Sequence, residues 1–165
     1  IDSDWAFALD QTILFARGQG IRHAALLRGE NLARVRSPHA AFRDGAAALL
    51  VEVGSTPSDA SFVGLGAEPF LTLDLDGDGA RMRDHGLPAE LPEAGRALLE
   101  KGGADRVYVE DWVPGSAVGD SRARVVRGSG IFAIPQLIER AGGERCAIVS
   151  LDPFKSRLGR IVVAS

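Results

Sequence analysis

Amphipathic segments alternate with short apolar runs along the whole chain. Apolar residues recur at helical spacing in three segments, which predicts helices over 5–17, 91–101 and 131–141. The residues expected to face the core are Ala6, Leu9, Ile13 and Ala16 in the first helix, Ala94, Ala97 and Leu98 in the second, and Ile131, Ile134, Leu137 and Ile138 in the third.

The remaining apolar runs are too short for comfortable helices and predict buried strands. They cover 23–27, 46–53, 61–66, 70–75, 107–113, 146–151 and 160–163, and we expect the last two to pair antiparallel. The runs at 46–53 and 146–151 are apolar on both faces, as in a sheet that is covered on each side. Helices that alternate with buried strands indicate one α/β layered domain over 1–165.

Composition narrows the class of protein. The chain has 165 residues, 45% hydrophobic and 25% charged, which suits one soluble globular domain. Its net charge of −3 gives no argument for binding nucleic acid or an anionic membrane, and no apolar run approaches the roughly 20 residues of a membrane span. The single cysteine, Cys146, excludes an internal disulfide, and we expect it to be a buried thiol in a reducing cytoplasm.

Two features of the sequence could hold a ligand, but each has a simpler structural interpretation. The segment from Asp74 to Gly79 has the acids and glycine that open a calcium loop, yet position twelve is His85 and no helix precedes the segment. We therefore expect a strand-ending Asp-Gly turn, and predict no metal and no cofactor. His23 lies in an apolar strand, and we expect it to be a satisfied core residue.

Four segments are similar to signature sequences of one enzyme family. Ile1–Leu9 reads IDSDWAFAL, where the family has the nucleophile motif DTACSSSL, and Arg43–Ala47 reads RDGAA, where it has GEGAG. Tyr108–Asp120 agrees with YVEAHGTGTPLGD at its first three and last two residues and at one internal glycine, and Ala147–Gly159 is similar to ALVNSFGFGGTNA. In this order, the segments resemble the elongating β-ketoacyl synthases of the thiolase-like superfamily.

The resemblance implies an α/β fold of the thiolase-like kind, which is part of an αβαβα sandwich. The βαβα portion that precedes the nucleophile turn in the family has no counterpart in this sequence, and the carboxy-terminal half is shortened. The chain is thus expected to be a single ketosynthase-like domain that lacks its N-terminal part. We expect a homo- or hetero-oligomer, because another surface must cover the apolar elements.

The same resemblance implies that the family's catalytic residues are replaced. The thiol nucleophile becomes Trp5, the first histidine becomes Trp112, the second histidine becomes Ser129, and the glycine-rich oxyanion loop becomes Pro153, Lys155 and Ser156. Neither indole can act as nucleophile or base, and we expect the loop residues to be unable to adopt the positive φ of glycine. The two indoles are interpreted either as filling the former pocket or as ordinary core aromatics.

The leading hypothesis is a non-catalytic ketosynthase-like subunit, similar in role to a chain-length factor, which partners an active synthase in polyketide or fatty-acid assembly. One alternative is an acyltransferase or hydrolase whose new site uses Asp4, Asp111 and Asp120, although Ser3 has no histidine placed to activate it. Another alternative is a structural piece of a larger thiolase-like protein.

Four residues are candidates for binding a substrate or a carrier. Arg122, Arg124 and Arg127 form an Arg-x-Arg-x-x-Arg run, and Phe154 lies in the segment that replaces the glycine-rich loop. The arginines could bind a phosphopantetheine or an acidic acyl carrier protein, or could form a solvated face.

Overall fold

The computed structural model describes residues 4–30, 35–36, 45–77, 79–111, 113–114, 123–126 and 133–164. In this part of the chain the helices are α1 (Trp5–Gly18), α2 (Glu93–Glu100) and α3 (Ala133–Arg140). The strands are β1 (His23–Glu30), β2 (Val35–Arg36), β3 (Gly45–Glu52), β4 (Asp59–Gly64), β5 (Leu71–Asp76), β6 (Gly79–Asp84), β7 (Arg106–Glu110), β8 (Ala123–Val126), β9 (Arg145–Asp152) and β10 (Arg157–Ala164).

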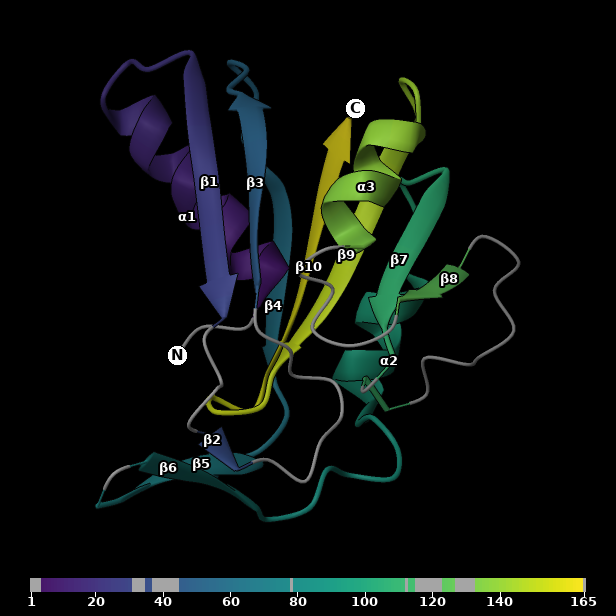
Figure 1. Ribbon diagram of the computed structural model, residues 1–165. Helices are drawn as coiled ribbons and strands as arrows, with labels where there is room; N and C mark the ends of the chain where they lie inside the picture. Colours follow the sequence, from purple (N-terminus) through teal and green to yellow (C-terminus); the bar gives the residue numbers. More distant parts are fainter. Residues whose placement is uncertain are drawn as a thin grey trace.

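The largest sheet has five strands in the order β4-β10-β9-β7-β8 (Figure 1). β10 pairs antiparallel with both β4 and β9, whereas β7 pairs parallel with both β9 and β8. The antiparallel pairing of the last two strands confirms the prediction. β1 and β3 form a separate antiparallel hairpin, and β2, β6 and β5 form a small third sheet.

α1 lies between the five-stranded sheet and the β1–β3 hairpin. Trp5, Ala6 and Leu9 on its buried face share one core with Ile148 and Ile161 of the sheet. On the other side, the same core includes hairpin residues that point inward, namely Leu26, Ala47, Leu49 and Val51. α3 adds Ile134 to this core. The buried face of α1 is the one that helical periodicity predicted.

α2 covers the opposite face of the five-stranded sheet. Leu91 and Leu98 pack against Val107, Val149 and Leu158 in a second core. β9 is consequently buried on both faces along seven of its eight residues, as its apolar pattern predicted. The described layers run in the order hairpin, α1 with α3, five-stranded sheet and α2.

The structure corrects four details of the sequence interpretation. β3 is not buried on both faces, since its residues alternate between partly buried and exposed. In α2, Gly95 and Leu98 point inward while Ala94 and Ala97 are exposed. Gly95 packs closely, since a Cβ there would lie 3.2 Å from Leu91 Cβ and 3.3 Å from Leu65 Cδ2.

β7 ends at Glu110 rather than at residue 113, because the chain turns there and the Val113 backbone N–H donates to the carbonyl oxygen of Glu110 at 3.0 Å. His23 is exposed at the start of β1 and is not a core residue. Sequence periodicity also missed the short strands β2 and β8, and the polar strand β6.

The segment with calcium-loop spacing forms the β5–β6 hairpin. Asp76 pairs with Gly79, and Gly77 between them has φ of 49°, a conformation that glycine adopts without strain. Asp74 lies within β5 and binds Arg83 of β6 at 2.7 Å, so its carboxylate has a cationic partner. The predicted Asp-Gly turn is confirmed.

Candidate functional site

The N-terminal end of α1 meets the connection between β9 and β10, and buried charged groups gather there. Asp4 is fully buried and caps the helix, because its Oδ1 accepts a hydrogen bond of 3.0 Å from the Phe7 backbone N–H. Ser150 of β9 donates its hydroxyl to the same oxygen and accepts a hydrogen bond of 3.0 Å from the Ala6 N–H. Side chains 146 positions apart in the sequence therefore satisfy the first turn of α1 together.

Cationic side chains complete this cluster. The Arg157 Nη2 lies 3.4 Å from Asp4 Oδ2 and 3.7 Å from Asp152 Oδ2. Its guanidinium stacks 4.0 Å from the centre of the Phe7 ring, which fixes its orientation. Lys155 Nζ lies 3.6 Å from the buried Asp152 Oδ2. The group thus contains two carboxylates and two cationic side chains of opposite charge. We call these residues the cap cluster, namely Asp4, Ser150, Asp152, Lys155 and Arg157.

The cap cluster lies at the N-terminal end of α1, which is the positive end of the helix dipole. Free N–H groups and the helix dipole make that position suitable for an anion or a thiolate. Here the carboxylate of Asp4 takes the Phe7 N–H, and Ser150 takes the Ala6 N–H. The chain itself therefore supplies the negative charge at this end of the helix.

The β9–β10 connection contradicts the expectation that its residues cannot adopt positive φ. Ser156 has φ of 48°, the only positive value for a residue other than glycine in the described segments. Its hydroxyl donates to the Glu68 carbonyl oxygen, and its own carbonyl accepts a hydrogen bond of 2.7 Å from Leu65. These bonds offset a conformation that costs on the order of 1 kcal/mol for an ordinary residue.

Trp5, the counterpart of the family's nucleophile, is a core residue in this structure. Its side chain is fully buried, and the Arg28 guanidinium lies 4.8 Å from its ring centre. Within the described residues, nothing accepts a hydrogen bond from its Nε1. Whether its indole meets that of Trp112 stays untested, because Trp112 lies outside the described residues.

The other predicted site residues do not come together in the described part of the chain. Arg124 is exposed on β8, Phe154 is half-buried beside the cap cluster, and Asp111 is exposed after β7. The remaining candidates lie outside the described residues, namely Ser3, Asp120, Arg122, Arg127 and Ser129.

Among the described residues, a hydroxyl contacts an imidazole at an exposed position on the β5–β6 sheet, where Thr72 Oγ1 lies 2.8 Å from His85 Nε2. Cys146 is buried on β9, and burial raises the pKa of its thiol, which keeps it protonated and unreactive. Ser150 contacts Asp4, but both are fully buried, and the described histidines, His23 and His85, are exposed. The described segments also contain no group of three His, Cys, Asp or Glu residues that could hold a metal, and no helix there is long and apolar enough to cross a membrane.

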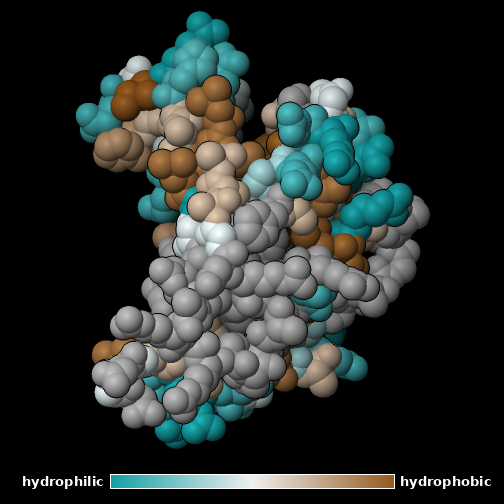
Figure 2. Space-filling view, viewed as in Figure 1, coloured by the Kyte–Doolittle hydropathy of each residue, from teal (hydrophilic) through white to brown (hydrophobic). Residues whose placement is uncertain are grey.

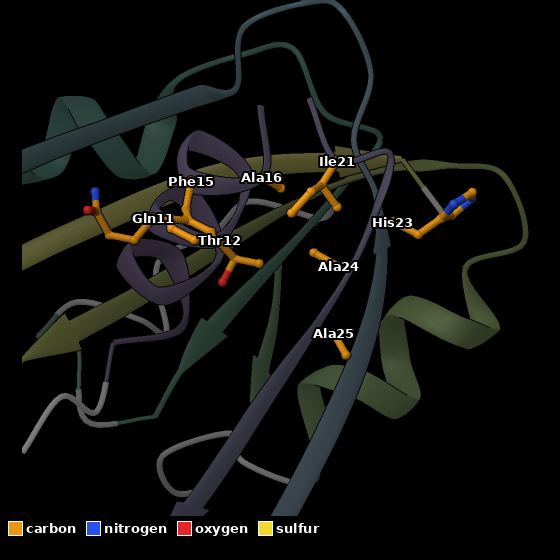
Figure 3. A pocket seen from close by; sticks show the side chains of 8 residues that line it. All are labelled: Gln11, Thr12, Phe15, Ala16, Ile21, His23, Ala24 and Ala25. Atoms are coloured by element: carbon orange, nitrogen blue, oxygen red, sulfur yellow. The ribbon is translucent and has the colours of Figure 1, made fainter. Parts of the chain in front are cut away.

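A shallow cleft of about 420 Å³ lies between α1 and β1 (Figure 3). Phe15 and Ile21 form much of its apolar wall, and Gln11, Thr12 and His23 contribute polar atoms. It adjoins the C-terminal half of α1, whereas the cap cluster lies at the other end of that helix. The cleft contains none of the residues that sequence analysis assigned to a site.

Comparison with known proteins identifies the fold. No protein-family model and no curated protein match the chain. Among solved structures, AbyA1, a tetronic acid condensing enzyme, aligns with 97% of this chain and 65% of its own chain at 22% identity and a TM-score of 0.61.

Two β-ketoacyl-[acyl carrier protein] synthases III align in the same way. The enzyme from Aquifex aeolicus VF5 is 16% identical over 96% of this chain and 63% of its own, with a TM-score of 0.59. The enzyme from Thermus thermophilus is 17% identical over 98% and 64%, with a TM-score of 0.56. The chain therefore has the thiolase-like fold of ketoacyl synthases, as predicted, and spans 63–65% of the length of these proteins.

The cap cluster was missed at the level of sequence. Asp4 directly before an apolar-periodic segment is a helix N-cap signal that was available. Nothing local indicated that Ser150, Asp152 and Arg157 would meet this residue, because only the pairing of β9 with β10 beside α1 brings them there.

Proposed function

We propose that this chain is a non-catalytic ketosynthase-like subunit that works beside an active β-ketoacyl synthase. The observation that carries the proposal is the cap cluster. In the resemblance to ketoacyl synthases, the nucleophile sits at the start of this helix. Here the counterpart of the nucleophile is the fully buried Trp5, and the residue before it, Asp4, has a buried carboxylate that is bound by Ser150 and Arg157.

A condensing enzyme needs a reactive thiol in this position, because the thiolate forms the acyl thioester. Asp4 would repel a second negative charge placed at the N-terminal end of α1. The first backbone N–H groups of this helix are already hydrogen-bonded, so they could not donate to a substrate carbonyl oxygen. The one thiol of the chain, Cys146, is buried elsewhere with a raised pKa. These features support a role in which the fold is retained without its chemistry.

The experiment is intact-mass measurement after incubation with acetyl and malonyl thioesters, with an active β-ketoacyl synthase III treated in parallel. The control enzyme should gain one acyl group, and this chain should gain none. A stoichiometric adduct on this chain would refute the proposal and favour an acyltransferase or hydrolase.

Part of the proposed role is assembly with other proteins. In the described part of the structure, β1 and β3 pair only with each other, which leaves their outer edges open to another strand. The exposed Arg124 belongs to the Arg-x-Arg-x-x-Arg run and could contact an acidic carrier protein. The presence of one buried thiol agrees with a cytoplasmic protein.

This assembly is tested by mixing the chain with an active ketosynthase and with its acyl carrier protein, and measuring mass by light scattering. The expected result is a complex with the synthase, and weaker carrier binding after the substitution Arg124→Glu. Failure to bind either protein at high micromolar concentration would contradict the partner role while leaving the absence of acylation unaffected.

A further inference from the structure

The sheet formed by β2, β6 and β5, here called the small sheet, lies apart from the two apolar cores. Leu71 of β5 and Met82 of β6 are buried, yet neither belongs to either core of the described residues. Figure 1 places the small sheet at the lower end of the molecule, and Figure 2 shows hydrophilic side chains there. Since β2 has only two residues, the small sheet is little more than a hairpin, which is marginally stable by itself in water.

The connection between β4 and β5 attaches the small sheet to the rest of the chain. Residues 65–70 lie across the turn between β9 and β10. The Leu65 N–H donates to the carbonyl oxygen of Ser156 at 2.7 Å, and the Ser156 hydroxyl donates to the carbonyl oxygen of Glu68. Ser156 therefore holds the connection through both its backbone and its side chain.

The end of the connection is bonded to the same turn. The N–H groups of Phe70 and Leu71 both donate to the carbonyl oxygen of Pro153, at 2.8 and 3.1 Å. The carbonyl oxygen of Phe70 accepts a hydrogen bond of 2.9 Å from the His85 N–H, just after β6. A movement of the small sheet therefore acts directly on the β9–β10 turn. We call residues 65–71 and 153–156, with the hydrogen bonds between them, the clasp.

The clasp holds Ser156 in an unfavourable backbone conformation. Ser156 has φ of 48°, and a residue other than glycine keeps such a value only where surrounding bonds enforce it. Here these bonds come from Leu65 and Glu68. When they break, the backbone of Ser156 is free to return to an ordinary conformation. The closed clasp and the strained serine thus form and disappear together, as one element with two states.

Ser156 lies between two residues of the cap cluster. Lys155 Nζ lies 3.6 Å from Asp152 Oδ2, and Arg157 Nη2 lies 3.4 Å from Asp4 Oδ2. The backbone of the turn positions both cationic side chains, so a change of conformation at Ser156 displaces them. The buried carboxylates of Asp4 and Asp152 then lose positive charge that stabilises them.

We infer that the clasp couples the small sheet to the cap cluster, so that opening of the clasp weakens the cap cluster and loss of the cap cluster loosens the clasp. The coupling acts in both directions because it is a free energy shared by two sites. Opening of the clasp is a local event that leaves the five-stranded sheet intact. A molecule that binds the small sheet changes the N-terminal end of α1 through this path.

The test is native-state hydrogen exchange of the chain, followed at single amide groups by NMR. Ser156→Ala removes the hydroxyl that binds Glu68 and leaves the unfavourable φ in place. Exchange should become about tenfold faster at Leu71, as expected for the loss of one hydrogen bond that holds the clasp closed. It should also become faster, by a smaller factor, at Phe7, whose N–H is bonded to Asp4 Oδ1 in the cap cluster.

Asp4→Asn is the reverse experiment. It retains a helix cap but removes the charge that Arg157 binds, and exchange at Leu71 should become faster although residue 4 lies outside the clasp. Ser58→Ala is the matched control, because it removes a hydroxyl that binds Asp10 at 2.6 Å, at the opposite end of β4 from the clasp. The control variant should exchange like the unmodified chain at both amide groups.

Two results would overturn the inference. One is an unchanged rate at Phe7 in Ser156→Ala or at Leu71 in Asp4→Asn. The other is an equal acceleration of the amide groups of β9, which would show a general loss of stability in place of local coupling. None of these measurements depends on acylation or on complex formation, so the inference and the proposed function fail independently.

Discussion

Cys146 illustrates how the position of one residue decides its chemistry. It lies on β9 with no exposed surface, and burial raises the pKa of its thiol. We predict that a disulfide reagent at pH 8 reacts with the native chain on the order of 100-fold more slowly than with the unfolded chain. Equal rates would show that β9 is accessible.

The raised pKa also has a consequence for stability. The unfolded thiol ionises near pH 8.5, and the folded thiol ionises only at higher pH, so the unfolded state loses its proton first. The contribution of Cys146 is therefore complete below about pH 8.5 and declines as the pH rises above it. Chemical unfolding of the chain and of Cys146→Ala from pH 7 to 10 should show a smaller alkaline loss in the variant.

Arg160 is a fully buried cation whose role is structural. Its Nη2 donates to the carbonyl oxygens of Lys101 and Gly102, at 3.1 and 2.9 Å, just after the end of α2. Arg160→Leu leaves these carbonyls without that donor, and we expect a loss of about 3 kcal/mol in the free energy of unfolding. Arg83→Leu, at an exposed arginine on β6, is the control and should change it little.

Ser156 shows where residue-level expectations are insufficient. Intrinsic backbone preference argues against positive φ at a serine, and the structure has φ of 48° there. The bonds with Glu68 and Leu65 come from a different segment, so the local sequence does not reveal them.

At the scale of elements, close packing of α1 on the sheet depends on one glycine. A Cβ on Gly159 of β10 would lie 2.9 Å from the Phe62 ring and 3.1 Å from the Ala6 Cβ. We predict that Gly159→Ala destabilises the protein by about 1–3 kcal/mol in denaturant unfolding. Gly64→Ala, on the adjacent strand with open space at its Cβ, should cause no loss.

The β5–β6 hairpin gives a prediction about calcium. Asp74 is held by Arg83, and the backbone of Asp76 pairs with Gly79 at the end of the β5–β6 hairpin. Millimolar calcium should change the melting temperature by less than about 1 °C, because only a ligand that binds the native state raises it. A rise of several degrees would contradict the turn interpretation.

At the scale of the whole molecule, Asp4 connects the central helix to the sheet. Asp4→Ala removes the helix cap and leaves the buried Ser150 and the half-buried Arg157 without this acceptor, so we expect a loss of about 3 kcal/mol. Asp4→Asn retains a good cap and should lose less. The difference between the two variants in urea unfolding measures the cap, and the remaining loss in Asp4→Asn measures the charge. Equal stability of all three proteins would show that the cap cluster contributes little.

The layered architecture explains which expectations succeeded. α1 and β9 were predicted with nearly their observed bounds. The apolar pattern of α1 is that of a helix with one buried face, and the pattern of β9 is that of a strand covered on both faces. β6 was missed because polar side chains dominate it and its pairing with β5, not its own pattern, makes it a strand. β3 was predicted to be buried on both faces because its outer residues are apolar, yet no described element covers them.

The sequence by itself determined the α/β class, the buried thiol, the three amphipathic helices and the resemblance to ketoacyl synthases, since each depends on local periodicity or contiguous motifs. Only the tertiary structure decided that Asp4, Ser150, Asp152 and Arg157 form one cluster, that Ser156 adopts positive φ, and that Leu27 and Leu50 stand exposed on one face. These features depend on contacts between segments up to 153 residues apart. Such contacts arise only when strands pair and layers stack, and no local pattern encodes which distant side chains will then be neighbours.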